Sequence, residues 1–220
     1  MNVKQSSALL ILIEGIFMNN KFEYKLYYKR NLPHYQPCGS YIFVTYRLAF
    51  SLPKKIIDEL NQQKEKFKIE LKKYPVEKQK KIQIDYSKKI FVLEDNFLDK
   101  YTDSHMWLKQ DNIAQMTMDS LLFFHNKKYI LICAVIMSNH VHILIKPMKK
   151  NDNDFYSIAE IIKNHKSFTA TQANKILKRS GKFWHHESYD HFIRDEKEYY
   201  RVIEYILNNP VNAGLIKEYF

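Results

Sequence analysis

Two histidines separated by a single residue, His140 and His142, are the side chains of this sequence whose type and spacing most directly suggest chemistry. They follow a long apolar run, in a context typical of a β-strand. Because side chains alternate along a strand, both imidazoles project from one face and can share a metal ion. The alternative is two histidines on the solvent-exposed face of a hairpin, because His-x-His is a short motif. A metal site would need a further ligand from elsewhere in the chain.

A second candidate group lies near the end of the chain, in the helical pattern of residues 199–209. Tyr205 and Asn209 are four residues apart and therefore share a helix face. The Asn209 amide oxygen could be the third metal ligand, beside a Tyr205 hydroxyl that acts as nucleophile. The alternative is a packed tyrosine and an asparagine at a fraying helix end, because Pro210 is expected to stop the helix.

The elements that position these groups follow from apolar periodicity and turn residues. Strands are expected at 39–50, 129–137 and 141–145, with another within 184–194; helices are expected at 54–73, 111–125, 155–177 and from Asp195 to Pro210. The two central strands form a hairpin across a tight turn. This order indicates an α+β fold, a ferredoxin-like antiparallel sheet with helices packed on one of its faces.

The 220 residues suit a single domain, which we assign to residues 22–220. Residues 54–108 are interpreted as a helical and irregular insertion after the first strand. Residues 1–21 are interpreted as a poorly ordered or misassigned extension, because the apolar run at 8–17 is too short to span a bilayer and Glu14 interrupts it. A chain that begins at Met18 is therefore expected to remain active.

Composition limits the class of partner. The excess of 35 Lys and Arg over 24 Asp and Glu gives a net charge of +11, which favours nucleic acid or an acidic membrane surface, or simply reflects a lysine-rich soluble protein. The 16 tyrosines and 14 phenylalanines suit stacking on single-stranded bases. The two cysteines have neither zinc-ligand nor disulfide spacing, which predicts a reducing cytoplasm. The four scattered glycines exclude a glycine-rich phosphate loop.

Several motifs in order resemble the HUH-superfamily single-tyrosine transposases, which include the REP-associated tyrosine transposases. The motifs are RNLPHY (30–35), YIFVTYRL (41–48), NHVHIL (139–144), KSFTA (166–170), FW (183–184), YDHFIRDE (189–196) and YILNNPVNAGL (205–215). The resemblance covers nearly the whole chain, although Ser138 stands where the family usually has proline. It implies a DNA transposase that cuts and rejoins single-stranded, hairpin-containing DNA through a 5′-phosphotyrosine.

The resemblance also implies roles for individual residues. His140 and His142 match the paired metal ligands, Tyr205 the nucleophile and Asn209 the third ligand. Two imidazoles and an amide oxygen suit Mg²⁺ or Mn²⁺, and the same ligands would admit Zn²⁺, Co²⁺ or Ni²⁺. Some relatives form dimers in which each tyrosine serves the partner's histidines, whereas REP-associated members act alone, so a homodimer and a monomer both remain open.

Basic residues near the predicted sheet and helices are expected to bind DNA phosphates, and the alternative for each is a solvated surface charge. They are Arg47, Lys146, Lys166 and Arg194. Two rival functions also remain. One is a catalytically decayed or domesticated protein that binds single-stranded nucleic acid without cutting it. The other is a histidine phosphoesterase built on the two His-x-Ser units that begin at His165 and His186.

Overall fold

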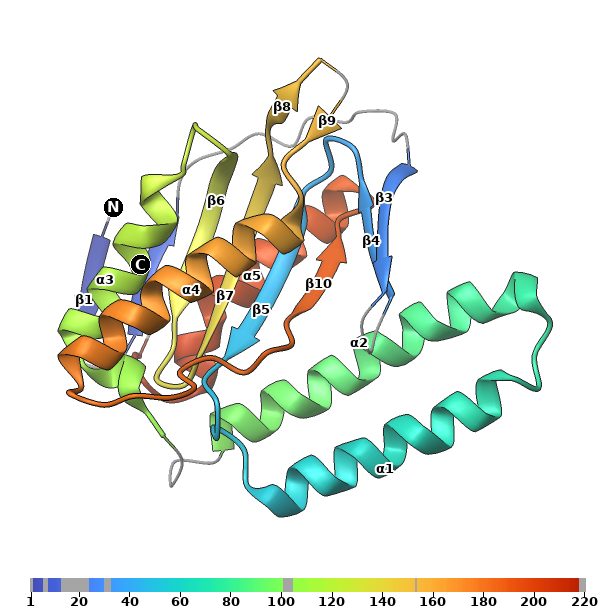
Figure 1. The fold of residues 1–220 in the computed structure, drawn as a ribbon, viewed down its shortest axis with the longest axis horizontal. Coiled ribbons are helices and arrows are strands. Elements are labelled where there is room, and N and C mark those ends of the chain that lie inside the picture. The colour runs from blue at the N-terminus through green and yellow to red at the C-terminus, as the bar shows by residue number, and fades with distance from the viewer. Residues whose placement is uncertain are drawn as a thin grey trace.

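The computed structural model describes residues 2–5, 8–12, 24–29, 33–100, 105–152 and 154–217. Its centre is a six-stranded antiparallel sheet with the strand order β1-β2-β6-β7-β5-β10 (Figure 1). Its strands are β1 (Asn2–Gln5), β2 (Ala8–Leu12), β5 (Ile42–Arg47), β6 (Tyr129–Ile136), β7 (His140–Pro147) and β10 (Tyr189–Phe192). Two small hairpins pair β3 (Tyr24–Lys29) with β4 (Pro33–Pro37), and β8 (Lys149–Asn151) with β9 (Asp154–Phe155).

The four strands β5, β6, β7 and β10 confirm the predicted ferredoxin-like α+β fold. Helix α3 (Asp111–Phe123) connects β5 to β6, and α4 (Ile158–Ile176) connects β7 to β10. This βαββαβ order places β5 and β7 side by side in the middle of the sheet. In their register Thr45 pairs with His142 and Arg47 with His140, so residues far apart in sequence meet at one end of these strands.

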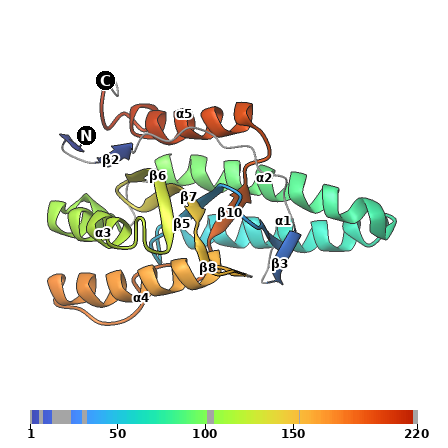
Figure 2. The same cartoon turned by 90° about the horizontal axis from the view of Figure 1, so that it is seen from above.

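Helices cover both faces of the sheet, and the prediction that they pack on one face is wrong. Figure 2 shows α3 and α4 on one side and α5 (Glu196–Asn212) on the other. The reason is that successive residues of the central strands, whose side chains point to opposite faces of the sheet, are both apolar. Val44 belongs to the core under α3 and α4, and Phe43 to the core under α5. Strands buried on both faces read as continuous apolar runs.

The segment predicted as a helical and irregular insertion is a pair of long helices, α1 (Lys54–Leu71) and α2 (Val76–Lys100). Figure 1 shows this helical hairpin lying beside the sheet. The predicted irregular part is wrong for α2, which is rich in Lys and holds no glycine or proline. A small core that includes Leu60 and Leu98 joins the two helices. No helix within the described ranges has the length and apolar character needed to cross a membrane.

The N-terminal segment contributes to the sheet, in contrast to the poorly ordered extension expected for residues 1–21. Strand β2 pairs with β6, from Leu9 opposite Ile136 to Leu12 opposite Cys133. Leu9, Leu10 and Ile11 are buried, with alternate residues reaching the two cores. The apolar character of residues 9–11 is therefore explained by their place beside β6, whose edge β2 pairs with and covers. Met18, the expected alternative start, lies outside the described residues.

Helix α5 continues through Pro210 to Asn212, so the predicted stop at the proline is wrong. In the last turn of a helix a proline removes only one backbone hydrogen bond, and the Pro210 carbonyl accepts one from the Leu215 N–H at 2.8 Å. At the other end, Asp195 caps the helix, because its carboxylate accepts a hydrogen bond from the Glu198 N–H. Asn209 therefore lies within a regular helix.

Candidate metal centre

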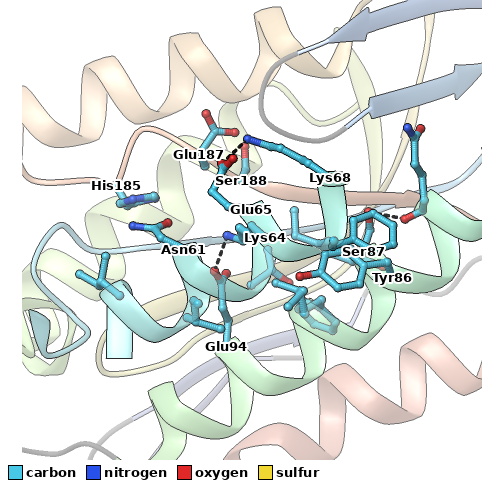
Figure 3. Close-up of a pocket in the computed structure, with 18 of the residues that line it drawn as sticks. Asn61, Lys64, Glu65, Lys68, Tyr86, Ser87, Glu94, His185, Glu187 and Ser188 are labelled. Carbon is cyan, nitrogen blue, oxygen red and sulfur yellow. Dashed lines mark hydrogen bonds and ion pairs between the residues drawn. The ribbon is translucent and has the colours of Figure 1, made fainter. Parts of the chain in front are cut away.

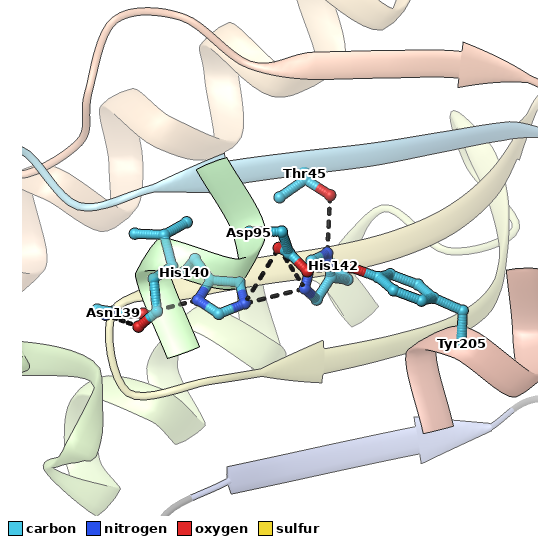
Figure 4. A network of polar contacts seen from close by, with 7 residues as sticks. Thr45, Asp95, Asn139, His140, His142 and Tyr205 are labelled. Atoms are coloured by element: carbon cyan, nitrogen blue, oxygen red, sulfur yellow. Dashed lines mark hydrogen bonds and ion pairs between the residues drawn. The ribbon is translucent and has the colours of Figure 1, made fainter. Parts of the chain in front are cut away.

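His140 and His142 lie at the start of β7, with both side chains on the face that α5 covers. Their exposed fractions are 1% and 0%, so the alternative of a solvent-exposed pair is wrong. The two Nε2 atoms are 2.9 Å apart (Figure 4). Val141, between them, belongs to the opposite core, as strand alternation predicts.

Hydrogen bonds from neighbouring side chains fix the orientation of both imidazoles. The Nδ1 atom of His140 is 2.6 Å from the Asn139 amide oxygen, which can only accept, so Nδ1 carries the proton and Nε2 keeps its lone pair. The Nδ1 atom of His142 is 2.7 Å from the Thr45 hydroxyl, which can accept a hydrogen bond from the ring N–H. Support of one ring nitrogen while the other is left for a metal is the usual arrangement of metal-binding histidines.

A third residue, Asp95 of α2, completes this group, and the sequence interpretation missed it. Its Oδ1 atom is 3.4 Å from His142 Nε2 and 3.8 Å from His140 Nε2. All three side chains are buried, and their potential ligand atoms lie within 4.8 Å of one another, so they could hold a metal ion. The available signal was its spacing from Phe91 and Leu98, which places a carboxylate in the apolar stripe of a helix.

Tyr205 and Asn209 both reach this centre from α5. The Tyr205 hydroxyl donates a hydrogen bond to Asp95 Oδ2, and its ring packs edge-on against His142 with the centroids 5.4 Å apart. The Asn209 side chain is 2% exposed and lies close enough to influence the pKa values of the two histidines, the aspartate and the tyrosine. The structure therefore brings together the residues that were predicted as ligands and nucleophile.

Burial controls the protonation of these groups. It lowers the pKa of His140 to about 3, assisted by the charge of His142, and it also lowers the pKa of His142 to about 3. Both imidazoles are therefore neutral at pH 7, as metal ligands must be. Burial raises the pKa of Asp95, against the opposing charge of His140. Burial, together with the charge of Asp95, raises the pKa of Tyr205 well above its ordinary value, so the phenol keeps its proton at neutral pH.

The donor atoms fit a divalent cation. Among the described residues, Asp95 Oδ1 and Asn209 Oδ1 are buried oxygen atoms without a hydrogen-bond partner. Unpartnered buried acceptors are costly, and a cation between them and the two Nε2 atoms would satisfy all four. Two imidazole nitrogens with a carboxylate and an amide oxygen suit Mn²⁺ or Mg²⁺, and also the softer divalent metals.

A cleft of about 770 Å³ opens beside the centre, between the helical hairpin and the edge of the sheet (Figure 3). Thr45 and Asp95 form part of its lining, so the cleft leads to the candidate metal ligands. Of the four residues predicted to bind DNA, all of them described, only Arg47 lines this cleft.

The other three predicted DNA-binding residues have contacts of their own. The Lys166 ammonium group donates to the carbonyl of His185 at 2.6 Å and helps to fix the loop before β10. The ammonium group of Lys146 lies 4.8 Å from the centre of the Tyr41 ring, and the Arg194 guanidinium packs on the ring of Phe192.

The rival pair of His-x-Ser units does not form one site. His165 is buried on the opposite face of the sheet, where its ring nitrogens lie 2.7 Å from the Tyr46 hydroxyl and 3.0 Å from the Ser120 hydroxyl. His186 is exposed, on the loop that lines the cleft. Because His165 is buried with both ring nitrogens in contact with hydroxyl groups, whereas His186 is exposed, the two histidines do not present a shared site for one phosphate.

Comparisons with known proteins give fold information only. No family model matches this chain, and no curated protein sequence matches it. One solved structure, described as a REP-associated tyrosine transposase bound to a REP hairpin, aligns with a TM-score of 0.47 and 15% sequence identity, over 86% of this chain and 75% of that chain. At this level of similarity the chemistry of the centre has to be argued from its own residues.

Proposed function

We propose that this protein is a metal-dependent DNA transposase that cuts and rejoins single-stranded, hairpin-containing DNA through a 5′-phosphotyrosine on Tyr205. The observation that carries the proposal is the convergence of Tyr205 on the buried group formed by Asp95, His140 and His142. A phenol beside a potential divalent-metal site is the combination that a covalent phosphodiester exchange requires. The substrate class comes from the family that the ordered sequence motifs resemble.

The reaction is a balanced exchange of phosphoesters. The Tyr205 oxygen forms a bond to phosphorus, the bond from phosphorus to the 3′ oxygen breaks, and the leaving 3′ oxygen takes up a proton from solvent. The phenol proton passes to Asp95, the carboxylate that already accepts its hydrogen bond. A bound divalent metal would withdraw charge from the scissile phosphate and orient its oxygens. Attack by a 3′ hydroxyl on the phosphotyrosine reverses these steps and rejoins strands without a nucleotide cofactor.

We assign the metal to His140, His142, Asp95 and Asn209, with Mg²⁺ or Mn²⁺ as the ion. Asn139 and Thr45 act on the imidazoles as positioning residues. The buried hydrogen bonds of both positioning residues and the unpartnered oxygens of Asp95 and Asn209 support a working centre over a decayed, binding-only copy. A site that had lost its chemistry would have no reason to keep costly buried acceptors.

We further propose that the tyrosine acts in cis. Tyr205 contacts Asp95 and His142 of its own chain, so a single chain holds every group that the reaction needs. Mixing Tyr205→Phe chains with His140→Ala chains is therefore expected to yield no covalent adduct. Recovery of adduct in the mixture would show that the tyrosine serves a partner chain instead.

The central test uses a labelled single-stranded hairpin oligonucleotide with Mg²⁺ or Mn²⁺. We expect the wild type to form a covalent protein–DNA adduct on a denaturing gel, with the phosphate located on Tyr205 by mass spectrometry. Tyr205→Phe should form none. Tyr200→Phe is a matched control, because Tyr200 is exposed on the same helix and should leave the adduct unchanged.

Three outcomes would contradict parts of the proposal. Adduct formation by Tyr205→Phe would move the nucleophile to another tyrosine, with Tyr199 and Tyr200 as the neighbouring candidates. Normal cleavage by His140→Ala would reject the metal assignment. Tight DNA binding by the wild type with no adduct under any divalent metal would favour the binding-only function.

A further inference from the structure

The cleft beside the metal centre has a wall that the proposed reaction does not yet use. Lys64 and Lys68 of α1 and the C-cap residue Lys72 all line it, at a spacing of four residues that places them on one side of the helix. Acidic residues line it too: Glu94 is paired with Lys64 at 3.1 Å and Glu65 with Lys68 at 2.6 Å. This wall of the cleft therefore carries three lysines, two of them in ion pairs with glutamates that also line the cleft.

Arg47 is the most unusual residue of this lining. It is 7% exposed, yet no carboxylate of the described residues forms an ion pair with it. Its hydrogen bonds are two long ones from Nη1, to the Leu48 carbonyl at 3.4 Å and to the Ser51 hydroxyl at 3.3 Å. Burial lowers the pKa of Arg47, and the charge of Glu94, which forms no direct ion pair with it, offsets only part of this effect. The remaining N–H groups of the guanidinium are suited to an oxyanion.

The place of Arg47 points to the kind of anion. It pairs across the sheet with His140, at the end of β5 that faces the metal centre. The charges of Arg47, Lys166 and Lys64 all act on His185, whose pKa is lowered to about 3, by burial first and by these cations second. Several positive groups therefore surround one part of the cleft, next to the residues proposed to act on a phosphodiester.

Other groups in the lining suit nucleotides rather than a free ion. The rings of Phe91 and Tyr189 are stacked with their centroids 4.2 Å apart, and those of Phe67 and Tyr86 are stacked at 3.5 Å. These flat surfaces are of the kind on which bases pack. The Tyr86 hydroxyl is buried with no hydrogen-bond partner, although it belongs to the lining of an open cleft (Figure 3).

We propose that the cleft is the channel for the single-stranded DNA next to the cut, that Arg47 binds a phosphate adjacent to the scissile one, and that α1 supplies the outer phosphate contacts. This inference rests on the proposed function, because that function supplies the DNA strand and the position of the cut. The helical hairpin is then a substrate-holding arm that also brings Asp95 to the metal. Arg47 suits the inner position because its planar fork can bind two phosphate oxygens at once.

The test measures binding of a short fluorescent single-stranded oligonucleotide by anisotropy, in EDTA so that no cutting occurs. We expect Arg47→Gln to weaken binding about tenfold and to reduce the slope of log K against log salt by about 0.7, the value for one lost contact to a single strand. Its melting temperature should stay close to that of the wild type, because Arg47 forms no direct ion pair among the described residues and its hydrogen bonds to Leu48 and Ser51 are long. Arg201→Gln, on the exposed surface of α5, should bind like the wild type.

Arg47→Lys guards against a folding defect, since it keeps the charge but loses the fork, and a several-fold loss of affinity is expected. Wild-type affinity in both Arg47 variants would overturn the inference, as would an equal loss in Arg201→Gln. Failure of the adduct test leaves this measurement intact, because Arg47-dependent binding in EDTA requires no chemistry. Conversely, an adduct that forms normally while Arg47→Gln binds normally rejects the channel and retains the transposase.

Discussion

The two faces of the sheet each bury a histidine centre, and the two centres differ in what remains unpaired. Under α3 and α4, both ring nitrogens of His165 are within hydrogen-bonding distance of hydroxyl groups, those of Tyr46 and Ser120. Under α5, the Nε2 atoms of His140 and His142 face each other and two nearby oxygens lack donors. The polar groups of the first centre are satisfied by the fold itself, whereas the second keeps unpaired atoms that a bound cation would satisfy.

The largest predicted effect separates these two centres directly. His140→Ala removes a metal ligand, so we expect Mn²⁺ binding, measured by isothermal titration calorimetry, to fall below detection while the protein stays folded. His165→Ala should keep Mn²⁺ affinity and lower the free energy of unfolding by about 3 kcal/mol, because it leaves a cavity and two unpaired hydroxyls. Equal loss of Mn²⁺ binding in both variants would contradict the claim that only the centre under α5 binds the cation.

A second prediction concerns strand β2, which contributes apolar side chains to both faces. Deletion of residues 1–12 would expose the apolar surface against which Leu9, Leu10 and Ile11 pack. At roughly 1.5 kcal/mol for each of the three side chains, the free energy of unfolding should fall by about 4.5 kcal/mol in a urea titration. A truncated chain with wild-type stability would restore the interpretation of a dispensable extension.

Asp95→Asn sharpens the comparison by removing one charge from the α5 face. The amide keeps the shape of the side chain, so packing is retained, but the anionic ligand is lost. We expect Mn²⁺ affinity to fall about 100-fold, near the upper end of the range found for residues that support a metal site. The melting temperature of the metal-free protein should not fall, because burial penalises the carboxylate. Glu94→Gln, the neighbouring acidic residue outside the metal centre, serves as the control.

The smallest predicted effect comes from a positioning residue. Asn139 accepts a hydrogen bond from His140 and donates one to the Leu98 carbonyl of α2 at 2.9 Å. Asn139→Ala should lower Mn²⁺ affinity about tenfold, as is usual when the support of a metal-binding histidine is removed. Asn139→Asp retains the acceptor and should recover most of that loss. If both variants bind Mn²⁺ like the wild type, Asn139 only stabilises the fold.

The sequence was sufficient for the central sheet and for the residues on β7 and α5. Alternation placed His140 and His142 on one face, and four-residue spacing placed Tyr205 beside Asn209, because these are local rules of strands and helices. Asp95 could not be found in this way. Its approach to the histidines depends on how a long helical insertion folds back on the sheet, and a mixed polar pattern does not specify that contact.

Errors at the two ends of the chain have physical causes as well. Pro210 was treated as a helix stop, although a proline in the final turn costs little. The apolar run at residues 8–17 was judged against membrane and targeting segments, whereas part of it forms strand β2, which pairs with β6. In both cases a local rule was outweighed by the tertiary surroundings.

The helical hairpin has a consequence for how this chain can diverge. Its base carries Asp95 and the Leu98 carbonyl that holds Asn139, whereas the turn between α1 and α2 lies at the far end of the hairpin (Figure 1). Homologues should therefore tolerate changes in length and sequence at that turn, while positions near Asp95 stay fixed. A search pattern built only from the two histidines and the tyrosine would discard this segment as a variable insertion and lose a ligand with it.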